Sequence, residues 1–469
     1  MRLTILGGGG FRVPLIHQAL LDDAERGDPV ITELSLYDQD KHRLAAIEAV
    51  LESQRAHWKT QHSASYSAQH GNPPLPTLRL HTELDAALSG AAAVFSAIRV
   101  GGPDGRVADE TVALDLGLLG QETVGAGGIS YGLRTLPVVE HIAARIAKTA
   151  PEAWVINFTN PAGMVTEAMS QTLGDRVIGI CDSPVGLGRR AVRALGMQPE
   201  HIRMDYVGLN HLGWLRGLWD GERDLLPQLL ADPGALASFE EGQLFGTDWL
   251  QALGALPNEY LHYYYLARES RGAIEETRSR GGCTRGQQLL QQQDQFYRAA
   301  TSDPSTAYAG WQRTRRERES TYMADNRRLA GDVSRAEADL DGGGYDRVAL
   351  AVMRAILRDE PTRLIVNVRN RGAVATLDAD AVVEVPCIVN ASGAHPLPAT
   401  PPSHHQQALM HAVKGVERDT MAAVRTGSRA LALRALGTHP LVDSTRLAGQ
   451  LLQGYQRAFP ELADVLDRP

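Results

Sequence analysis

The hydrophobic and polar positions of the first two hundred residues alternate between short apolar runs and longer segments with helical periodicity. The apolar runs are rich in β-branched and aromatic side chains, which is typical of buried strands. They predict strands at residues 2–6, 33–38, 92–98, 153–158 and 176–180. Strands that alternate with helices predict a parallel sheet with crossover helices on both faces. We therefore expect an α/β domain at residues 1–195, with a Rossmann-like doubly wound parallel sheet.

The pattern changes after this first domain. Strands are predicted within 203–221, 363–372 and 381–389, and helices within 240–335 and 401–440. The two later strands are expected to pair antiparallel. A second domain of mixed α+β structure, largely helical, is therefore predicted for residues 196–469. Its polar stretch 328–346 is rich in Gly and Asp and predicts a mobile loop or a connection between helices.

Composition places the chain among water-soluble globular proteins. The 469 residues are 43% apolar and 22% charged, and their number is sufficient for two domains. The net charge of −8 is small for this length. It gives no reason to expect nucleic acid or an anionic membrane as a partner, because a surface that follows phosphates carries a basic excess. No segment approaches the roughly 20 apolar residues needed to span a bilayer.

Cysteine content bears on the compartment. Cys181, Cys283 and Cys387 are too few for a disulfide framework and form no CxxC pair. The first residues, MRLTILGGGG, predict a strand and lack the pattern of a signal peptide. We therefore expect a cytoplasmic protein.

The Gly-rich segment LGGGGF, residues 6–11, follows the first predicted strand and precedes a helix. Backbone N–H groups in such a turn can approach a pyrophosphate, with the positive end of the helix behind them. The third glycine of a GxGxxG pattern is missing, so the motif alone is weak. Asp38 ends the second strand, where an acid binds the ribose and favours NAD over NADP. The predicted NAD site comprises Gly7, Gly9, Gly10, Phe11, Arg12 and Asp38; a turn that merely packs is the alternative.

Cys181 and His211 each follow a strand-like run, the second within GLNHLGW. The carboxyl ends of strands in an open α/β sheet meet at the ligand crevice, so a thiolate and an imidazole can bind one metal ion there. A single cysteine at a strand end is more often a small core residue. With Asp182 and Asn210 beside them, the two interpretations carry equal weight from spacing alone.

Other polar residues interrupt apolar or Gly-rich stretches. Arg99 in IRVGG is a candidate anion clamp or an ordinary ion pair, and Glu122 in GQETVGAGG is a candidate catalytic acid or a helix cap. Asn160 in FTNPAG precedes a proline, which is also a common turn start. The tyrosines of LPNEYLHYYYL, residues 256–266, are core residues or part of the chemistry.

Together these motifs resemble family 4 of the glycoside hydrolases. The resemblance extends from residue 7 to residue 387 and rests on the order of many motifs. They are GGG after the first strand, LYD, IRVGG, GQET, LRTLPV, FTNPAG, GIC-x-x-P, GLNHLGW, LPNEYLHYYY and VNVRNRG with VVEVPC. The family is an exception among glycosidases because it depends on NAD.

The resemblance implies a cycle of oxidation, elimination, addition and reduction. Hydride leaves C3 of the sugar for NAD, the proton on C2 is removed, and the glycosidic bond breaks by elimination. Water then adds, and the hydride returns. A divalent metal, usually Mn²⁺, holds the oxygens on C2 and C3, which brings the C2 proton within reach of a side-chain base.

The resemblance also assigns roles to residues. Cys181 and His211 match the metal ligands, and Asn160 and Asn210 match positions that contact the sugar. Tyr260 is our candidate for the base; its unperturbed pKa is about 10, so the metal must favour the phenolate. The remaining candidates are Glu122 for aglycone departure, Arg99 for the 6-phosphate of the substrate, and Arg285 as a second choice for that phosphate.

Substrate choice departs from the family patterns. Members acting on 6-phospho-β-glucosides tend to have Asn after the Cys, those acting on 6-phospho-α-glucosides Asp and Met, and those acting on unphosphorylated substrates His. Here Asp182 and Ser183 follow Cys181. The Asp favours a phosphorylated glycoside, and IRVGG, GQET, FTNPAG and GLNHLGW are more similar to the β-acting branch.

We therefore predict a 6-phospho-β-glucosidase that forms a homodimer or homotetramer. A 6-phospho-α-glucosidase and an unphosphorylated glycosidase are alternatives within the family. An NAD-dependent 2-hydroxy-acid dehydrogenase is an alternative of another class.

Overall fold

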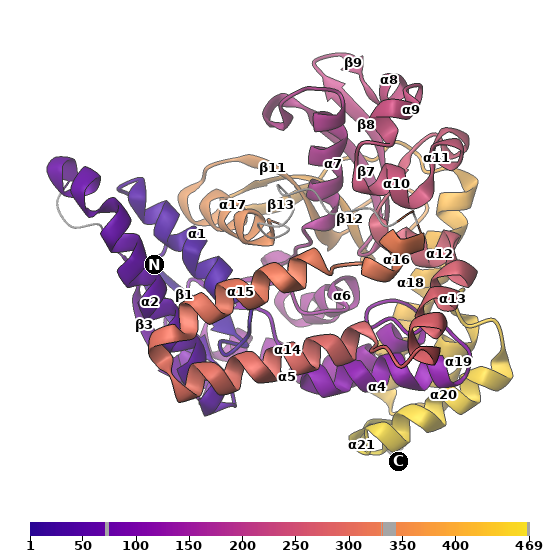
Figure 1. The fold of residues 1–469 in the computed structure, drawn as a ribbon, viewed down its shortest axis with the longest axis horizontal. Helices are drawn as coiled ribbons and strands as arrows, with labels where there is room; N and C mark the ends of the chain where they lie inside the picture. The colour runs from indigo at the N-terminus through magenta and orange to yellow at the C-terminus, as the bar shows by residue number, and fades with distance from the viewer. Residues whose placement is uncertain (71–74, 330, 332–343, 467–469) are drawn as a thin grey trace.

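The computed structural model describes residues 1–70, 75–329, 331 and 344–466 (Figure 1). Within these residues, one sheet of thirteen strands runs through the molecule. Its order is β10 (Leu256–Pro257), β8 (Leu212–Asp220), β7 (Arg203–Leu209), β12 (Val382–Asn390), β11 (Thr362–Arg369), β6 (Val177–Gly179), β5 (Trp154–Asn157), β4 (Ala93–Ser96), β1 (Arg2–Leu6), β2 (Glu33–Tyr37) and β3 (Thr77–His81). In addition, β13 (Gly393–Pro396) pairs with β12, and β9 (Arg223–Asp224) pairs with β8. Most of the predicted mobile loop at 328–346 lies outside the described residues.

The N-terminal half of the sheet is parallel from β3 to β6. All five strands predicted there are present, and the doubly wound arrangement is confirmed. The sixth strand, β3, was not predicted. Its residues are mostly exposed because it forms the edge of the sheet, so it carries no apolar run. The helices that follow these strands are α1 (Val13–Glu25), α2 (Lys41–His70), α3 (Leu84–Leu88), α4 (Gly102–Asp115), α5 (Gly125–Thr149), α6 (Ala162–Leu173) and α7 (Ser183–Ala194).

The C-terminal half of the sheet is antiparallel. The predicted strands at 363–372 and 381–389 form β11 and β12, and the region 203–221 forms the hairpin of β7 and β8. This half joins the parallel half where β11 pairs with β6, through Asn367 and Gly179. The two predicted domains therefore share one sheet, and the boundary at residue 195 stays a prediction.

Long helices of the C-terminal half pack on the N-terminal half. They are α14 (Arg285–Ser302), α15 (Ala307–Ser320), α17 (Tyr345–Arg358) and α18 (His404–Thr426). Figure 1 shows α14 and α15 side by side; both pack against α2, and α14 also packs against α4. Helix α17 packs against α1, and α18 packs against α5. The two halves are thus interlocked by helices as well as by the sheet.

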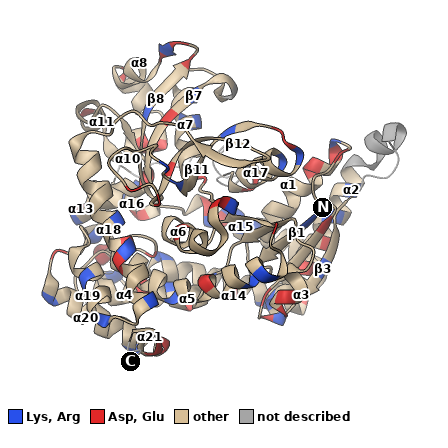
Figure 2. Ribbon diagram, turned by 180° about the vertical axis from the view of Figure 1, so that it is seen from behind, with Lys and Arg blue, Asp and Glu red and all other residues tan. Residues whose placement is uncertain are grey.

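The remaining helices extend the second half. They are α8 (Leu226–Leu230), α9 (Pro233–Leu236), α10 (Glu240–Phe245), α11 (Thr247–Leu253), α12 (His262–Tyr265), α13 (Ala267–Ser279), α16 (Ala324–Leu329), α19 (Arg429–Thr438), α20 (Thr445–Ala458) and α21 (Glu461–Leu466). None of the helices in the described ranges combines the length and apolar character needed to cross a membrane. In Figure 2, basic and acidic residues are interspersed along the helices, which agrees with the small net charge.

Buried apolar side chains connect the halves. One cluster contains Ile5 of β1 and Ile178 of β6 together with Tyr206 of β7 and Val366 of β11. Because burial of apolar surface is the main favourable term in folding, a core shared in this way holds the two halves firmly against each other.

Candidate active site

One cavity of about 990 Å³ is lined by every site residue that the sequence predicted. They are Gly7, Gly9, Gly10, Phe11, Arg12, Asp38, Arg99, Glu122, Asn160, Cys181, Asn210, His211, Tyr260 and Arg285. Most of them follow β1, β2, β4, β5, β6 or β7. Residues of α14 and α15 also line the cavity, so both halves of the chain build it.

The Gly-rich turn between β1 and α1 lies tightly against its neighbours. Gly7 has a φ of 84°, and a Cβ there would lie 2.6 Å from the carbonyl oxygen of Ala97, so only glycine fits. The N–H of Gly9 donates to Asp38 Oδ2 at 3.0 Å. The acid at the end of β2 is therefore held beside the turn, where the sequence predicts a ribose-binding carboxylate.

The carbonyl groups of the same turn are held from the second half of the chain. The Tyr297 hydroxyl donates to Gly9 O at 2.6 Å, Trp311 Nε1 to Phe11 O at 2.8 Å, and the Tyr345 hydroxyl to Arg12 O at 2.8 Å. These three donors were not predicted from the sequence. Their partners are backbone atoms about 300 positions away, and no local pattern marks such a contact.

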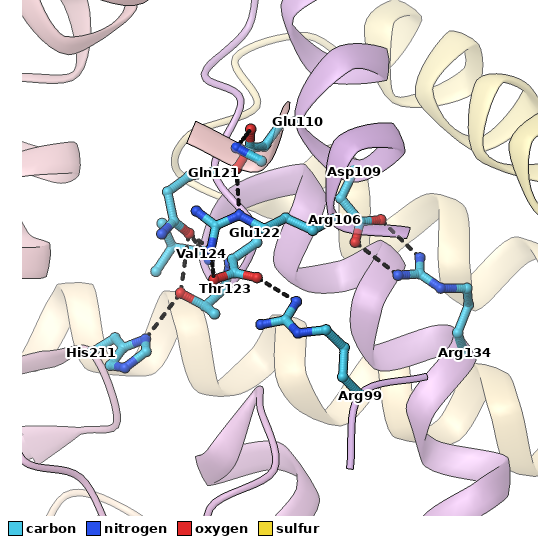
Figure 3. Close-up of polar contacts among 11 residues, drawn as sticks. Arg99, Arg106, Asp109, Glu110, Gln121, Glu122, Thr123, Val124, Arg134 and His211 are labelled. Atoms are coloured by element: carbon cyan, nitrogen blue, oxygen red, sulfur yellow. Dashed lines mark hydrogen bonds and ion pairs between the residues drawn. The ribbon is translucent and has the colours of Figure 1, made fainter. Parts of the chain in front are cut away.

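Glu122 is bound by two arginines (Figure 3). Arg99 donates to one carboxylate oxygen and Arg106 to the other, while Arg106 Nε also donates to Glu110 at 2.8 Å. Burial raises the pKa of Glu122, but Arg106 and Arg99 outweigh it and lower that pKa to about 2. The carboxyl group is therefore ionised at neutral pH and carries no proton that it could donate as an acid. This arrangement favours a role in positioning the arginines, and the role in aglycone departure stays a prediction.

His211 lies in the two-residue turn between β7 and β8. Its backbone φ is 62°, which is unusual for a residue other than glycine. This backbone conformation costs on the order of 1 kcal/mol. Its ring stacks on that of Tyr260, with centroids 3.6 Å apart and planes at 3°. Burial lowers the pKa of His211 to about 3, so the imidazole is neutral, as a metal ligand must be.

Cys181 follows β6 and is buried. Burial raises the pKa of its thiol well above the usual range, and the carboxyl groups of Glu384 and Asp182 add to the rise. A thiolate there requires a cation beside it. The described residues contain no cluster of three or more His, Cys, Asp or Glu side chains that could hold a metal.

A soft pair of one sulfur and one nitrogen on a cavity wall nonetheless fits a divalent cation. Cys181 and His211 would supply two ligands, and the other positions would remain open towards the cavity. Open positions are typical of catalytic metal sites.

Tyr260 has a phenol neighbour and a carboxyl neighbour. The hydroxyl of Tyr322 lies 3.4 Å from the Tyr260 oxygen and 3.4 Å from Glu259 Oε1. Burial raises the pKa of Tyr260 well above its usual value, and it raises that of Glu259 to about 7. Tyr263 also lines the cavity, whereas Tyr265 accepts a hydrogen bond from Trp214 Nε1 at 2.8 Å and does not line it. The sequence did not single out Glu259 or Tyr322.

Arg285 and Arg318 also line the cavity. Arg285 donates to the Thr321 hydroxyl at 2.6 Å and to the Arg318 carbonyl at 2.8 Å, and within the described ranges neither arginine has an ion pair with a carboxylate. Burial and neighbouring arginines lower the pKa of Arg285 to about 10 and that of Arg318 to about 9. Positive charge is thus in excess here, which favours an anionic ligand. Arg318 was not predicted from the sequence because it is one of four arginines in α15, and nothing in the local pattern distinguishes it from the others.

The comparisons with known proteins cover nearly the whole chain. Residues 2–197 match the family 4 glycosyl hydrolases, and residues 206–442 match the C-terminal domain of that family. The 6-phospho-beta-glucosidase BglT of Thermotoga maritima is 28% identical over 457 residues, which is 97% of each chain. The maltose-6'-phosphate glucosidase of Bacillus subtilis strain 168 is 29% identical over 483 residues, 99% of this chain and 97% of the relative.

Among solved structures, the 6-phospho-beta glucosidase from Thermotoga maritima with manganese, NAD⁺ and glucose-6-phosphate is similar. It superimposes with a TM-score of 0.79 at 26% identity, over 98% of this chain and 99% of that chain. The chain belongs to family 4 of the glycosyl hydrolases.

Proposed function

We propose that this glycosyl hydrolase cleaves 6-phospho-β-glucosides with the help of NAD and a divalent cation, by transient oxidation of the sugar at C3. The observation that carries the proposal is the shared cavity of the Gly-rich turn, Cys181, His211 and Tyr260 with the unpaired Arg285. The relative named for 6-phospho-β-glucosides and the neighbour solved with manganese, NAD⁺ and glucose-6-phosphate support it.

The dinucleotide would bind along the Gly-rich turn. Gly7, Gly9 and Gly10 line the cavity, and the helix α1 behind them presents its positive end to a pyrophosphate. Asp38 would accept the ribose hydroxyls and repel a 2′-phosphate, which favours NAD over NADP. When bound, the nicotinamide would take a hydride from C3 and return it, and the cation would withdraw electrons from the oxygens on C2 and C3.

Cys181 Sγ and His211 would hold Mn²⁺ or another divalent cation. Tyr260, stacked on His211, would remove the C2 proton. Burial disfavours its phenolate, so its work as a base depends on the positive charge held by Cys181 and His211. Asn160 and Asn210 line the same cavity and would bind sugar hydroxyls.

The 6-phosphate would bind Arg285 with Arg318, rather than Arg99. Arg99 was the first choice from the sequence, but its guanidinium is engaged by Glu122. Arg285 and Arg318 have no carboxylate partner in the described part of the chain, so a phosphate would relieve their mutual repulsion.

Substrate class is tested with α- and β-linked p-nitrophenyl glucosides, each with and without the 6-phosphate, in the presence of NAD⁺ and Mn²⁺. We expect rapid hydrolysis of the 6-phospho-β-glucoside alone. Activity only on the 6-phospho-α-glucoside would show that the enzyme is a 6-phospho-α-glucosidase instead. Activity only on unphosphorylated glucosides would refute phosphate binding by Arg285 and Arg318.

The route is tested by hydrolysis in D₂O. Removal and return of the C2 proton should place deuterium at C2 of the released sugar, without net formation of NADH. Product without deuterium would exclude elimination. Accumulation of NADH in proportion to product would indicate a dehydrogenase.

A further inference from the structure

A chain of hydrogen bonds leads from the side chain of Gln121 to His211 (Figure 3). Gln121 Oε1 accepts from the backbone N–H of Thr123 at 2.6 Å and of Val124 at 2.9 Å. A backbone N–H can only donate, so the atom at this position must be the amide oxygen. The orientation of the Gln121 amide is therefore fixed by the backbone.

This fixed oxygen determines the direction of the next hydrogen bond. Thr123 Oγ1 lies 3.1 Å from Gln121 Oε1 and 3.0 Å from His211 Nδ1. A threonine hydroxyl has one hydrogen and can donate only once. If it donated to the histidine, two oxygen atoms would face each other at 3.1 Å without a hydrogen between them. The hydroxyl therefore donates to Gln121 and accepts from Nδ1–H of His211.

A proton on Nδ1 leaves Nε2 of the neutral ring with a free lone pair. His211 lines the cavity, and its only hydrogen bond among the described residues is through Nδ1. In Figure 3 the second ring nitrogen is turned away from Thr123. The left-handed backbone conformation of His211 shows that the surrounding structure imposes this position on the residue.

We propose that Gln121 and Thr123 are positioning residues that fix the Nδ1–H tautomer of His211 and thereby make Nε2 its metal-binding atom. The inference deepens the proposed function and rests on it for the presence of the cation. A ligating imidazole depends on such a partner at its other nitrogen, which sets both the tautomer and the orientation of the ring.

The loop that carries the two residues is held closely by its surroundings. A Cβ on Gly127, in the first turn of α5, would lie 2.1 Å from the backbone oxygen of Gln121. A Cβ on Gly120 would lie 2.6 Å from the backbone oxygen of Glu110. These close approaches show that the loop is tightly packed, which favours a distance from Thr123 to His211 that is preformed before any ligand binds.

The experiment compares Thr123→Val with Thr123→Ser. The valine keeps the shape but loses the hydroxyl, whereas the serine keeps the hydroxyl. Thr426→Val is the matched control, because the Thr426 hydroxyl donates to Ala422 O on the surface of α18. The Mn²⁺ dissociation constant is measured by electron paramagnetic resonance. The tautomer is read from ¹⁵N spectra of histidine-labelled, metal-free protein, with His211→Gln identifying the resonance.

We expect the metal-free wild type to carry its proton on Nδ1 of His211. Thr123→Val should weaken Mn²⁺ binding about 10- to 100-fold. Thr123→Ser and Thr426→Val should bind Mn²⁺ as the wild type does. A proton on Nε2 in the wild type, or unchanged Mn²⁺ binding in Thr123→Val, overturns the inference.

Failure of the proposed function gives a different result. If the wild type shows the Nδ1–H tautomer but binds no Mn²⁺, the metal in the proposed function is refuted, whereas the proton assignment is supported. Circular dichroism of each variant identifies a loss of fold. The spectrum of the wild type alone can still refute the tautomer.

Discussion

Two carboxylates on neighbouring segments, Asp109 and Glu122, are both buried and both bound by arginine, yet their electrostatics are opposite (Figure 3). Asp109 forms a bidentate pair with Arg134 at 2.7 and 2.8 Å, and both side chains are 1% exposed. Glu122 is shared by Arg99 and Arg106. Burial raises the pKa of Asp109 in spite of its partner, whereas two arginines lower the pKa of Glu122.

The difference lies in how many arginines contact each of the two carboxylates. One guanidinium neutralises Asp109 but does not offset the cost of removing the carboxylate from water. The pair has no net charge, and we interpret it as a structural contact. Arg99 and Arg106 both contact Glu122, and Arg106 also pairs with Glu110, so these two arginines and two carboxylates balance.

The positive excess in the cavity that Glu122 lines belongs to Arg285 and Arg318, which have no carboxylate partner in the described part of the chain. Arginines without a carboxylate partner beside a cavity therefore mark a place for an anionic ligand.

The largest expected effect follows from breaking the balanced pair. Asp109→Asn leaves Arg134 buried and without a counter-charge, and should lower the free energy of unfolding by about 3–5 kcal/mol. Urea denaturation measures the loss. The matched control is Asp419→Asn, since Asp419 also forms a bidentate pair, with Arg434 on the surface. Equal behaviour of the two variants would contradict the structural role of Asp109.

A carboxyl that pairs with no arginine among the described residues extends the comparison. Glu384 accepts hydrogen bonds from Asn367 Nδ2 at 2.9 Å and the Tyr206 hydroxyl at 3.2 Å, and burial raises its pKa to about 7. Between its ordinary pKa and pH 7, the folded state binds more protons than the unfolded state, so stability falls as the pH rises.

Glu384→Gln mimics the protonated carboxyl and should remove the contribution of Glu384 to this pH dependence, so that stability falls less steeply with pH than in the wild type. At pH 8 it should raise the free energy of unfolding of the metal-free protein by about 3 kcal/mol. Urea denaturation between pH 5 and pH 8 measures both effects. A variant with the pH dependence of the wild type would show that Glu384 is ionised in the fold.

The excess positive charge of Arg285 and Arg318 is tested by replacing one of these two arginines. Arg318→Met should reduce the affinity for inorganic phosphate about 10- to 100-fold, because a hydrogen bond to a charged group contributes about 1.5–3 kcal/mol. The measurement is the rise in melting temperature with phosphate concentration. Arg316→Met, exposed on the same helix, is the control and should respond as the wild type does. An undiminished response of Arg318→Met would exclude Arg318 from the anion site.

The smallest expected effect concerns Glu122 itself. Glu122→Gln should cost only about 1–2 kcal/mol of stability, less than Asp109→Asn, because water in the cavity can solvate the released guanidiniums. The side chain of Arg99 is already 33% exposed. Urea denaturation of the two variants under the same conditions tests the order. A loss as large as that of Asp109→Asn would make Glu122 a structural residue.

The sequence by itself determined many of the local elements and a set of candidate residues that line one cavity. Apolar runs fix buried strands because burial acts on each residue, and β1, β2, β4, β5 and β6 were found in this way. Strand-end residues such as Cys181 and Asn160 converge in one cavity because parallel strands bring their carboxyl ends to one edge. The family resemblance, now borne out, depended on the same motifs.

Only the tertiary structure decided which partners these residues have. The pairing of Asn367 with Gly179, which merges two predicted domains into one sheet, joins positions far apart in the chain. The hydrogen bond from the Tyr297 hydroxyl to the Gly-rich turn and the contact of Thr123 with His211 also join positions far apart in the chain. Charge balance and tautomer are properties of such contacts, and a local pattern contains no record of them because they arise only when distant segments pack together.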